Sequence, residues 1–265
     1  MPSPAKPDVV IEPIAAFRDN YIWLLIRDHR AAVVDPGTAD PVRALLNARG
    51  LMLETILVTH HHADHTGGVA ALAAETSAAV MGPAREDIAT GGARLQRLRE
   101  GDTVCVLGCN LNVIDVPGHT AGHIAFHAPE LQAVFCGDTL FAGGCGRLFE
   151  GTPAQMLDSL TRLAKLPGAT RVFCAHEYTL ANLRFAREVE PDNPFLAQRQ
   201  QACVRQREQA LPTVPSTLDE ERATNPFLRV DEPAVRAAAD RRQPGAGRSA
   251  VDTFAALRTW KNAFA

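Results

Sequence analysis

Residues 58–68 read VTHHHADHTGG and hold four of the chain's nine histidines within six positions. The run follows an apolar stretch of strand length, and loops at strand ends are where a rigid sheet presents functional groups. Imidazole suits zinc, iron and related metals, and a carboxylate is a normal additional ligand. In a tightly turned loop, His60 and His62 can face one ion while Asp64 and His65 face another. The cluster therefore predicts a metal site rather than a solvated polar loop.

Three more segments place a potential metal ligand where a predicted strand ends. His119 lies in a turn after residues 111–116, Asp138 follows a glycine, and His176 comes directly after the last predicted strand, residues 171–175. One such residue alone is often structural, for example as the cap of a turn. Three strand ends with a ligand each, together with the histidine cluster at a fourth, predict a metal centre.

Short strands and a few helices alternate irregularly over the first two thirds of the chain. Residues rich in β-branched and apolar side chains predict strands at 9–14, 21–26, 31–35, 53–59, 103–107, 111–116, 123–127, 133–136 and 171–175, with a hairpin turn at Asp28-His29-Arg30. Helical spacing predicts helices at 41–49, 69–74 and 153–165. Because many strands follow one another without a helix between them, we expect sheets packed face to face with helices outside.

The composition changes near residue 179, where strand-like runs end and Ala, Leu, Arg and Gln dominate. Helical spacing predicts helices at 179–189, 194–210 and 251–264, and residues 241–249 are expected to form a loop. The sequence therefore predicts a smaller helical domain at the C-terminal end.

Length, charge and cysteine content exclude several classes of protein. The chain has 265 residues and a formal net charge of −3, whereas a nucleic-acid-binding surface is usually strongly basic. Residues 1–14 lack the basic and apolar segments of a signal peptide, and no run of about 18 apolar residues predicts a membrane span. The six cysteines are scattered, so we expect reduced, mostly buried thiols and a cytoplasmic, reducing compartment.

The order His-x-His-x-Asp-His, followed by a distant His, Asp and His, resembles the metallo-β-lactamase superfamily. The resemblance implies an α/β fold, an αββα sandwich with two metal ions at one edge. By this resemblance, the first ion is held by His60, His62 and His119, the second by Asp64, His65 and His176, and Asp138 bridges both. His61, His123 and His127 match no ligand position and are interpreted as supporting or structural groups.

A closer resemblance, over nearly the whole chain, is to the hydroxyacylglutathione hydrolase (glyoxalase II) family. The segments that carry it are FRDNYIW at 17–23, DTLF at 138–141, GCGRLFEG at 144–151, HEYT at 176–179 and LRTWK at 257–261. The resemblance implies a metallo-β-lactamase-like catalytic domain at 1–176 and a helical substrate-binding domain at 177–265. It also implies hydrolysis of S-(2-hydroxyacyl)glutathione thioesters, with S-D-lactoylglutathione giving glutathione and D-lactate in methylglyoxal detoxification.

Glutathione carries two carboxylates, so its thioester requires a local cationic patch on this acidic protein. Arg258 and Lys261 are three residues apart and share a helical face, and the Arg147 guanidinium can pair with a carboxylate bidentately. The resemblance adds Tyr178 and Phe149 to the substrate-binding residues. Several family members carry Lys and Tyr where this chain has Arg147 and Phe149, which affects substrate affinity rather than chemistry because phenylalanine has no hydroxyl.

Two metal ions about 3.5–4 Å apart share one water and lower its pKa from 15.7 to roughly 7, which supplies hydroxide to attack the thioester. Asp64 and Asp138, as ligands, also orient this hydroxide. Zinc is the expected metal, and imidazole with carboxylate also admits iron and manganese. We expect a monomer without nucleic-acid or membrane partners.

Three alternatives stay open at this point. The first is a mononuclear iron persulfide dioxygenase, which also resembles this family and acts on glutathione persulfide. The second is a lactonase, β-lactamase or RNA-processing nuclease. The near-neutral net charge of the chain and the basic pair Arg258 and Lys261 do not fit these activities well. The third is a metal-bound interaction module without catalytic activity.

Overall fold

The computed structural model describes residues 8–264, which form two compact units. The N-terminal unit consists of the chain up to Asp115 together with Ala121–Gly137. The C-terminal unit consists of Val116–Thr120 together with the chain from Asp138 onward. The first seven residues of the N-terminal stretch, for which no signal peptide is expected, lie outside the described residues. Among the described helices, none has the length and apolar character needed to cross a membrane.

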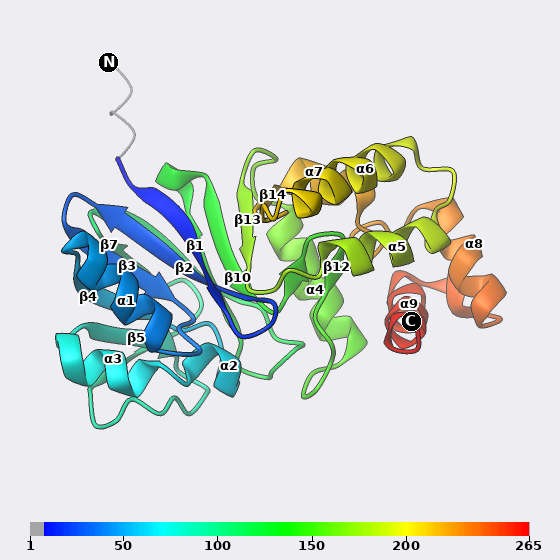
Figure 1. Cartoon of the computed structure of the whole chain (residues 1–265). Helices are drawn as coiled ribbons and strands as arrows, with labels where there is room; N and C mark the ends of the chain where they lie inside the picture. Colours follow the sequence, from blue (N-terminus) through cyan, green and yellow to red (C-terminus); the bar gives the residue numbers. More distant parts are fainter. Residues whose placement is uncertain (1–7, 265) are drawn as a thin grey trace, which may run out of the picture. The chain divides into compact units, whose positions relative to one another are not determined.

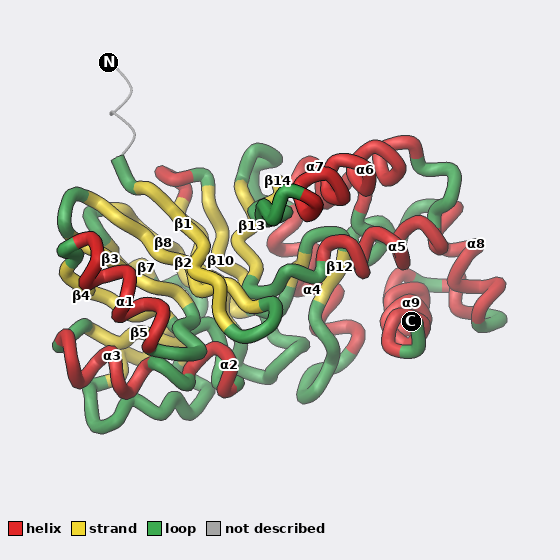
Figure 2. Tube along the Cα trace, viewed as in Figure 1, coloured by secondary structure: helices red, strands yellow, loops and turns green. Residues whose placement is uncertain are grey.

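The first sheet of the N-terminal unit has six strands in sequence order (Figure 2). They are β1 (Val10–Ala16), β2 (Asn20–Arg27), β3 (Arg30–Val34), β4 (Met52–Leu57), β5 (Ala79–Pro83) and β6 (Leu95–Leu98). The first three pair antiparallel, and the pairs from β3 to β6 are parallel. The hairpin turn predicted at residues 28–30 is confirmed between β2 and β3, with Asp28 in the left-handed region at φ 56°.

Helices α1 (Asp40–Arg49) and α3 (Val69–Thr76) cover one face of this sheet, as Figure 1 shows. Alternate strand residues such as Leu24 and Val33 join α1 and α3 in one buried core cluster. Their neighbours on the opposite face, among them Leu25, are buried as well. Because both faces are covered at β2 and β3, these two strands read as continuous apolar runs rather than as an alternating pattern.

The second sheet of the N-terminal unit contains four antiparallel strands. They are β7 (Thr103–Val106), β8 (Cys109–Asp115), β9 (Ile124–Ala128) and β10 (Ala133–Gly137). A one-turn 3₁₀ helix, Pro129–Leu131, joins β9 to β10. The two sheets are linked where Arg27 Nη1 donates a 2.9 Å hydrogen bond to the carbonyl of Leu107.

The C-terminal unit is mainly helical, with two short pairs of strands. Its elements are the hairpin β11 (Leu140–Phe141) and β12 (Gly144–Cys145), α4 (Pro153–Ala164), the antiparallel pair β13 (Arg171–Cys174) and β14 (Ser216–Thr217), α5 (Thr179–Val189), α6 (Pro194–Glu208), α7 (Leu218–Thr224), α8 (Pro233–Arg242) and α9 (Ala250–Asn262). The helices predicted at 153–165, 179–189, 194–210 and 251–264 are confirmed within two residues, whereas α7 and α8 were not predicted.

The compact units divide between Gly137 and Asp138, whereas the sequence predicts a domain boundary after residue 176. The segment that begins at Asp138 packs on the helices. Asn182 of α5 donates to the carbonyl of Ala142, and Glu221 of α7 accepts from the N–H of Gly143. The boundary after residue 176 stays a prediction.

Candidate metal centre

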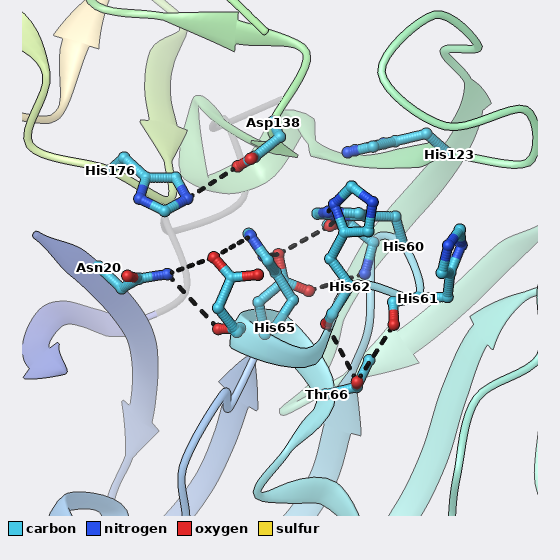
Figure 3. Close-up of polar contacts among 12 residues, drawn as sticks. Asn20, His60, His61, His62, His65, Thr66, His123, Asp138 and His176 are labelled. Atoms are coloured by element: carbon cyan, nitrogen blue, oxygen red, sulfur yellow. Dashed lines mark hydrogen bonds and ion pairs between the residues drawn. The ribbon is translucent and has the colours of Figure 1, made fainter. Parts of the chain in front are cut away.

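The histidine-rich loop leaves β4 and turns into the short helix α2 (Ala63–Thr66). The hydroxyl of Thr66 donates to the carbonyls of His61 and His62, at 3.3 and 3.0 Å, and so closes the turn (Figure 3). A glycine follows because a Cβ at Gly67 would lie 2.5 Å from the carbonyl oxygen of Gly37. The sequence therefore sets the loop tightly against the turn after β3.

Asp35, at the end of β3, is the buried acceptor around which the loop is arranged. Its carboxylate accepts from the N–H and the hydroxyl of Thr59, each at 2.7 Å, and from His65 Nδ1 at 3.1 Å. Its backbone is left-handed at φ 53°, a strained conformation for a residue with a side chain. From the sequence, Asp35 was predicted only as the last residue of the strand at 31–35. An aspartate immediately after a buried strand was the available signal.

These hydrogen bonds fix which ring nitrogens keep a lone pair. An ionised carboxylate only accepts, so His65 Nδ1 is the protonated nitrogen and His65 Nε2 carries the lone pair. The Thr59 hydroxyl donates to Asp35 and therefore accepts from His60 Nδ1 at 3.1 Å. His60 Nε2 consequently presents its lone pair, 3.2 Å from His62 Nδ1. Orientation of a ligand histidine by a carboxylate is typical of metal sites.

Asp64 is held from the opposite side by Asn20, the first residue of β2. The Asn20 amide donates 3.0 Å to the Asp64 carboxylate and 3.5 Å to its carbonyl (Figure 3). The other imidazole nitrogen of the neighbouring histidine, His65 Nε2, lies 3.6 Å from the Asp64 carboxylate. The hairpin segment FRDNYIW thus contributes a supporting amide that the sequence analysis did not assign.

Two further groups support the loop from within the N-terminal unit. The buried carboxylate of Glu86 accepts from the backbone N–H of His61 at 2.5 Å, from His61 Nδ1 at 3.0 Å and from the N–H of Gly122 at 3.1 Å. The His123 ring stacks on His60, with centroids 4.5 Å apart. Of the histidines that match no ligand position, His61 belongs to the loop and faces Glu86, whereas His123 lies beside the loop against His60.

The C-terminal unit brings together the other three predicted ligands. His119 Nε2 and His176 Nε2 each lie 3.4 Å from a different oxygen of the Asp138 carboxylate. Figure 3 shows the His176 ring directed at Asp138. His119 Nδ1 donates to the carbonyl of Arg147 at 2.9 Å, so the lone pair of His119 faces the carboxylate from Nε2.

The donors within each unit fit a divalent metal ion. A lone pair on His119 Nε2 and a carboxylate oxygen are both acceptors, and two acceptors that face each other require a cation or proton between them. The same holds for His65 Nε2 and the Asp64 carboxylate. Neutral imidazoles oriented by hydrogen bonds at their other nitrogen, together with carboxylates, form the donor set of zinc, iron and manganese centres.

The predicted substrate-binding residues all belong to the C-terminal unit. Arg147 and Phe149 are exposed, and the Phe149 ring stands edge-on to His119 at 5.2 Å between centroids. The Tyr178 ring stacks on His176 at 4.7 Å. Arg258 is buried, donates 2.7 Å to the carbonyl of Cys145, and has no hydrogen-bond partner at Nε among the described residues.

Lys261 is half-buried in a cationic environment. Burial lowers the pKa of its amine to about 8, and the nearby cations Arg258, Arg184 and Arg147 act in the same direction. The amine donates 3.3 Å to the carbonyl of Ala181. A lysine surrounded by cations rather than carboxylates is an unfavourable arrangement by itself, and an anionic ligand relieves it.

Comparison with protein-family sequence models divides the chain into two matches. Residues 16–176 match the metallo-beta-lactamase superfamily, and residues 177–264 match the hydroxyacylglutathione hydrolase C-terminus. The chain is 55% identical over 260 residues to the hydroxyacylglutathione hydrolase of Pseudomonas aeruginosa (strain LESB58), covering 97% of this chain and 100% of the relative. It is 58% identical over 256 residues to that of Alkalilimnicola ehrlichii (strain ATCC BAA-1101 / DSM 17681 / MLHE-1), covering 95% of this chain and 98% of the relative.

Solved structures show the same fold at lower identity. The BLEG-1 B3 metallo-beta-lactamase superposes with a TM-score of 0.62 at 22% identity, over 83% of this chain and 99% of that chain. TTHA1623, solved in a di-iron-bound form, superposes with a TM-score of 0.54 at 32% identity, over 62% of this chain and 91% of that chain. The family resemblance and the fold class predicted from the sequence are confirmed.

The Asp35 arrangement predicts that Asp35→Asn weakens metal binding. The amide keeps one acceptor oxygen and turns a donor toward Thr59 or His65, so it cannot hold both groups and the His65 tautomer is released. We expect metal affinity to fall by about 10–100-fold. Metal release to a chelator, followed by competition titration, measures this change. Asp28→Asn, an exposed turn carboxylate with the same chemical change, is the control. An unchanged affinity in Asp35→Asn would refute the orienting role.

Proposed function

We propose, from the premise that this chain belongs to the hydroxyacylglutathione hydrolase family of the metallo-β-lactamase superfamily, that it hydrolyses S-(2-hydroxyacyl)glutathione thioesters. The proposed substrate is S-D-lactoylglutathione, with glutathione and D-lactate as products in methylglyoxal detoxification. The observation that carries the proposal is identity of 55–58% with hydrolases of that name over nearly the whole of both chains. We further propose that the protein works as a monomer in the cytoplasm. In support, all six cysteines are free, and five of them are buried.

The proposed cofactor is a pair of divalent ions, with zinc as the expected metal. We propose that His60, His62 and His119 hold one ion, that Asp64, His65 and His176 hold the other, and that Asp138 binds both. The orientation of His60 and His65 by hydrogen bonds supports the part of this assignment in the N-terminal unit. The approach of His119 and His176 to separate oxygens of Asp138 supports the part in the C-terminal unit.

When bound, the ions supply hydroxide at neutral pH and a Lewis acid for the thioester carbonyl oxygen. The residues of the chain keep the ligands in place for this chemistry. Asp35 and the Arg147 carbonyl fix the tautomers of His65 and His119. Asp64 and Asp138 carry carboxylates that accept a hydrogen bond from the attacking group and so orient it. The leaving thiolate of glutathione needs little help from a general acid.

We propose that Arg147, Arg258 and Lys261 bind the carboxylates of the glutathione moiety, with Tyr178 beside its backbone. Lys261 is half-buried in a cationic environment, which supports an anionic ligand. Arg258 has one N–H committed to the Cys145 carbonyl and an unpaired Nε, so it retains donors for a ligand. Phe149 stands where several family members have tyrosine and offers an apolar contact in place of a hydroxyl.

The direct test combines elemental analysis with a hydrolysis assay on S-D-lactoylglutathione. We expect two divalent ions per chain and release of glutathione thiol. Asp138→Ala and His62→Ala should lower turnover by about a thousandfold or more because each removes a proposed ligand. His29→Ala, in the exposed turn between β2 and β3, is the matched control and should retain the natural rate. Near-natural turnover in either ligand variant would overturn the assignment. Oxygen consumption with glutathione persulfide, without thioester hydrolysis, would favour a dioxygenase instead.

The lowered pKa of Lys261 predicts a pH-dependent Michaelis constant. The amine is charged below its pKa of about 8 and loses its charge above it, so binding of the substrate carboxylate should weaken as the pH rises. We expect KM to rise by up to about tenfold between about pH 7 and pH 9. In Lys261→Arg the cation persists, because the guanidinium does not deprotonate in this range, and the rise should be lost.

Comparison of the two proteins removes the titration of the substrate itself from the measurement. Steady-state kinetics at several pH values give KM and kcat separately for each. If KM of the natural protein and of Lys261→Arg change in parallel with pH, Lys261 does not bind the substrate through its charge.

A further inference from the structure

A fully buried carboxylate, Glu221 of α7, holds the turn of the hairpin β11–β12. Glu221 is 0% exposed, and its Oε2 accepts the backbone N–H of Gly143 at 2.8 Å. Gly143 lies at the hairpin turn with a left-handed φ of 67°, and a Cβ there would lie 3.0 Å from the Leu183 side chain. Glu221 therefore takes the backbone donor of a turn whose conformation and packing both favour glycine.

Asn225, one helical turn after Glu221, secures the two strands of the same hairpin. Its amide nitrogen donates to the carbonyls of Phe141 and Gly144, at 3.2 and 2.9 Å, and to Glu221 Oε2 at 3.0 Å. Both residues are fully buried. The hairpin is thus bound through one backbone donor and two backbone acceptors by neighbouring side chains at the end of α7.

Arg199 of α6 completes this group and supplies its counter-charge. Arg199 Nη2 lies 2.5 Å from Glu221 Oε1, and Nη1 donates 2.6 Å to the Thr224 hydroxyl. The Arg199 side chain is 3% exposed and the Glu221 side chain 0%. A buried ion pair is a poor source of stability, since desolvation opposes the attraction between the charges. The Arg199–Glu221 pair is better explained by the geometry that it imposes on the hairpin.

The hairpin connects the metal ligand Asp138 to the cation Arg147. It starts two residues after Asp138 and ends two residues before Arg147. The carbonyl of Cys145 in β12 accepts from Arg258, and the carbonyl of Arg147 accepts from His119 Nδ1. A Cβ at Gly146 would lie 1.9 Å from the Asp138 carbonyl oxygen, so the returning strand passes directly over the Asp138 backbone. A shift of the hairpin therefore moves a metal ligand, the orienting partner of a second ligand, and two cations.

We propose that Glu221 is a positioning residue, which together with Arg199 and Asn225 fixes the hairpin so that Asp138 and Arg147 stand at their metal-binding and substrate-binding places. The inference rests on the proposed function and adds to it a remote determinant in the helical unit. This positioning role explains why an acidic residue is fully buried where the hairpin turn meets α7. Glu221 touches neither substrate nor metal in this role.

The test is Glu221→Gln, with Glu190→Gln as the matched control. Glutamine keeps one acceptor oxygen, and the Arg199 guanidinium favours that oxygen on its own side. The N–H₂ group then faces the Gly143 N–H and the Asn225 amide, so the hairpin loses its acceptor. Glu190 is also buried and pairs bidentately with Arg229 at 2.8 and 3.0 Å, in the same unit. The two substitutions remove the same kind of ion pair, but only one of them touches the hairpin.

We expect Glu221→Gln to lower metal affinity by about tenfold or more in chelator competition and to raise KM for S-D-lactoylglutathione several-fold. Glu190→Gln should leave both unchanged, although both variants lose stability. Asn225→Ala keeps the ion pair, removes the hydrogen bonds to Phe141 and Gly144, and should act as Glu221→Gln does. It also serves as the test should Glu221→Gln not fold.

The proposal would be overturned if Glu221→Gln and Asn225→Ala both had the metal affinity and the KM of the wild-type protein. Equal losses in Glu190→Gln would also overturn it, because they would reflect general destabilisation. Metal affinity is measured without turnover. If the natural protein hydrolysed no thioester while Glu221→Gln still lost metal affinity, the proposed function would fail and the positioning role of Glu221 would stand.

Discussion

The hydrogen bonds that Asp35 accepts decide which nitrogens of the histidine loop are available as ligands. An imidazole has one lone pair when it is neutral, and only the nitrogen without the proton presents it. By accepting from His65 Nδ1 and from the Thr59 hydroxyl, the Asp35 carboxylate leaves the lone pairs on His65 Nε2 and His60 Nε2. Asp35 is buried and has a left-handed backbone, so the fold tolerates local strain to place this one acceptor.

The C-terminal unit follows the same principle with a backbone acceptor. The carbonyl of Arg147 accepts from His119 Nδ1 and thereby turns His119 Nε2 toward Asp138. That carbonyl is in place only if the hairpin β11–β12 is in place. The Asp35 side chain orients predicted ligands in the N-terminal unit, and the Arg147 carbonyl does so in the C-terminal unit. The orientation of His119 therefore depends on the residues that hold the hairpin β11–β12.

The sequence predicts where several strands end and which potential metal-ligating side chains follow them, because periodicity and residue type are local properties. The apolar runs of β1 to β4 and the helices α5 and α9 followed from the same signals, whereas β5 and β6 were not predicted. Helix α7 was missed because two of the three residues that it buries, Glu221 and Thr224, are polar and only Leu218 is apolar, so no apolar period marks it. A related reason explains why Asp35, Asn20 and Glu86 were missed. Each acts through one or more hydrogen-bond partners that lie 24 to 44 positions away in the sequence.

The basic residues near the C-terminus show a different limit of sequence reasoning. An Arg-x-x-Lys pair on a helix predicts two side chains on one face and gives no information about their surroundings. In the structure this helical face is partly buried, and Arg258 and Lys261 differ in how far they are buried. Arg258 is buried and partly committed to the Cys145 carbonyl, whereas Lys261 has its pKa lowered to about 8 by burial and by neighbouring cations. Cations held close together without a carboxylate between them repel one another, and a bound anion removes that repulsion. The surroundings of Lys261 therefore favour an anion beside its amine.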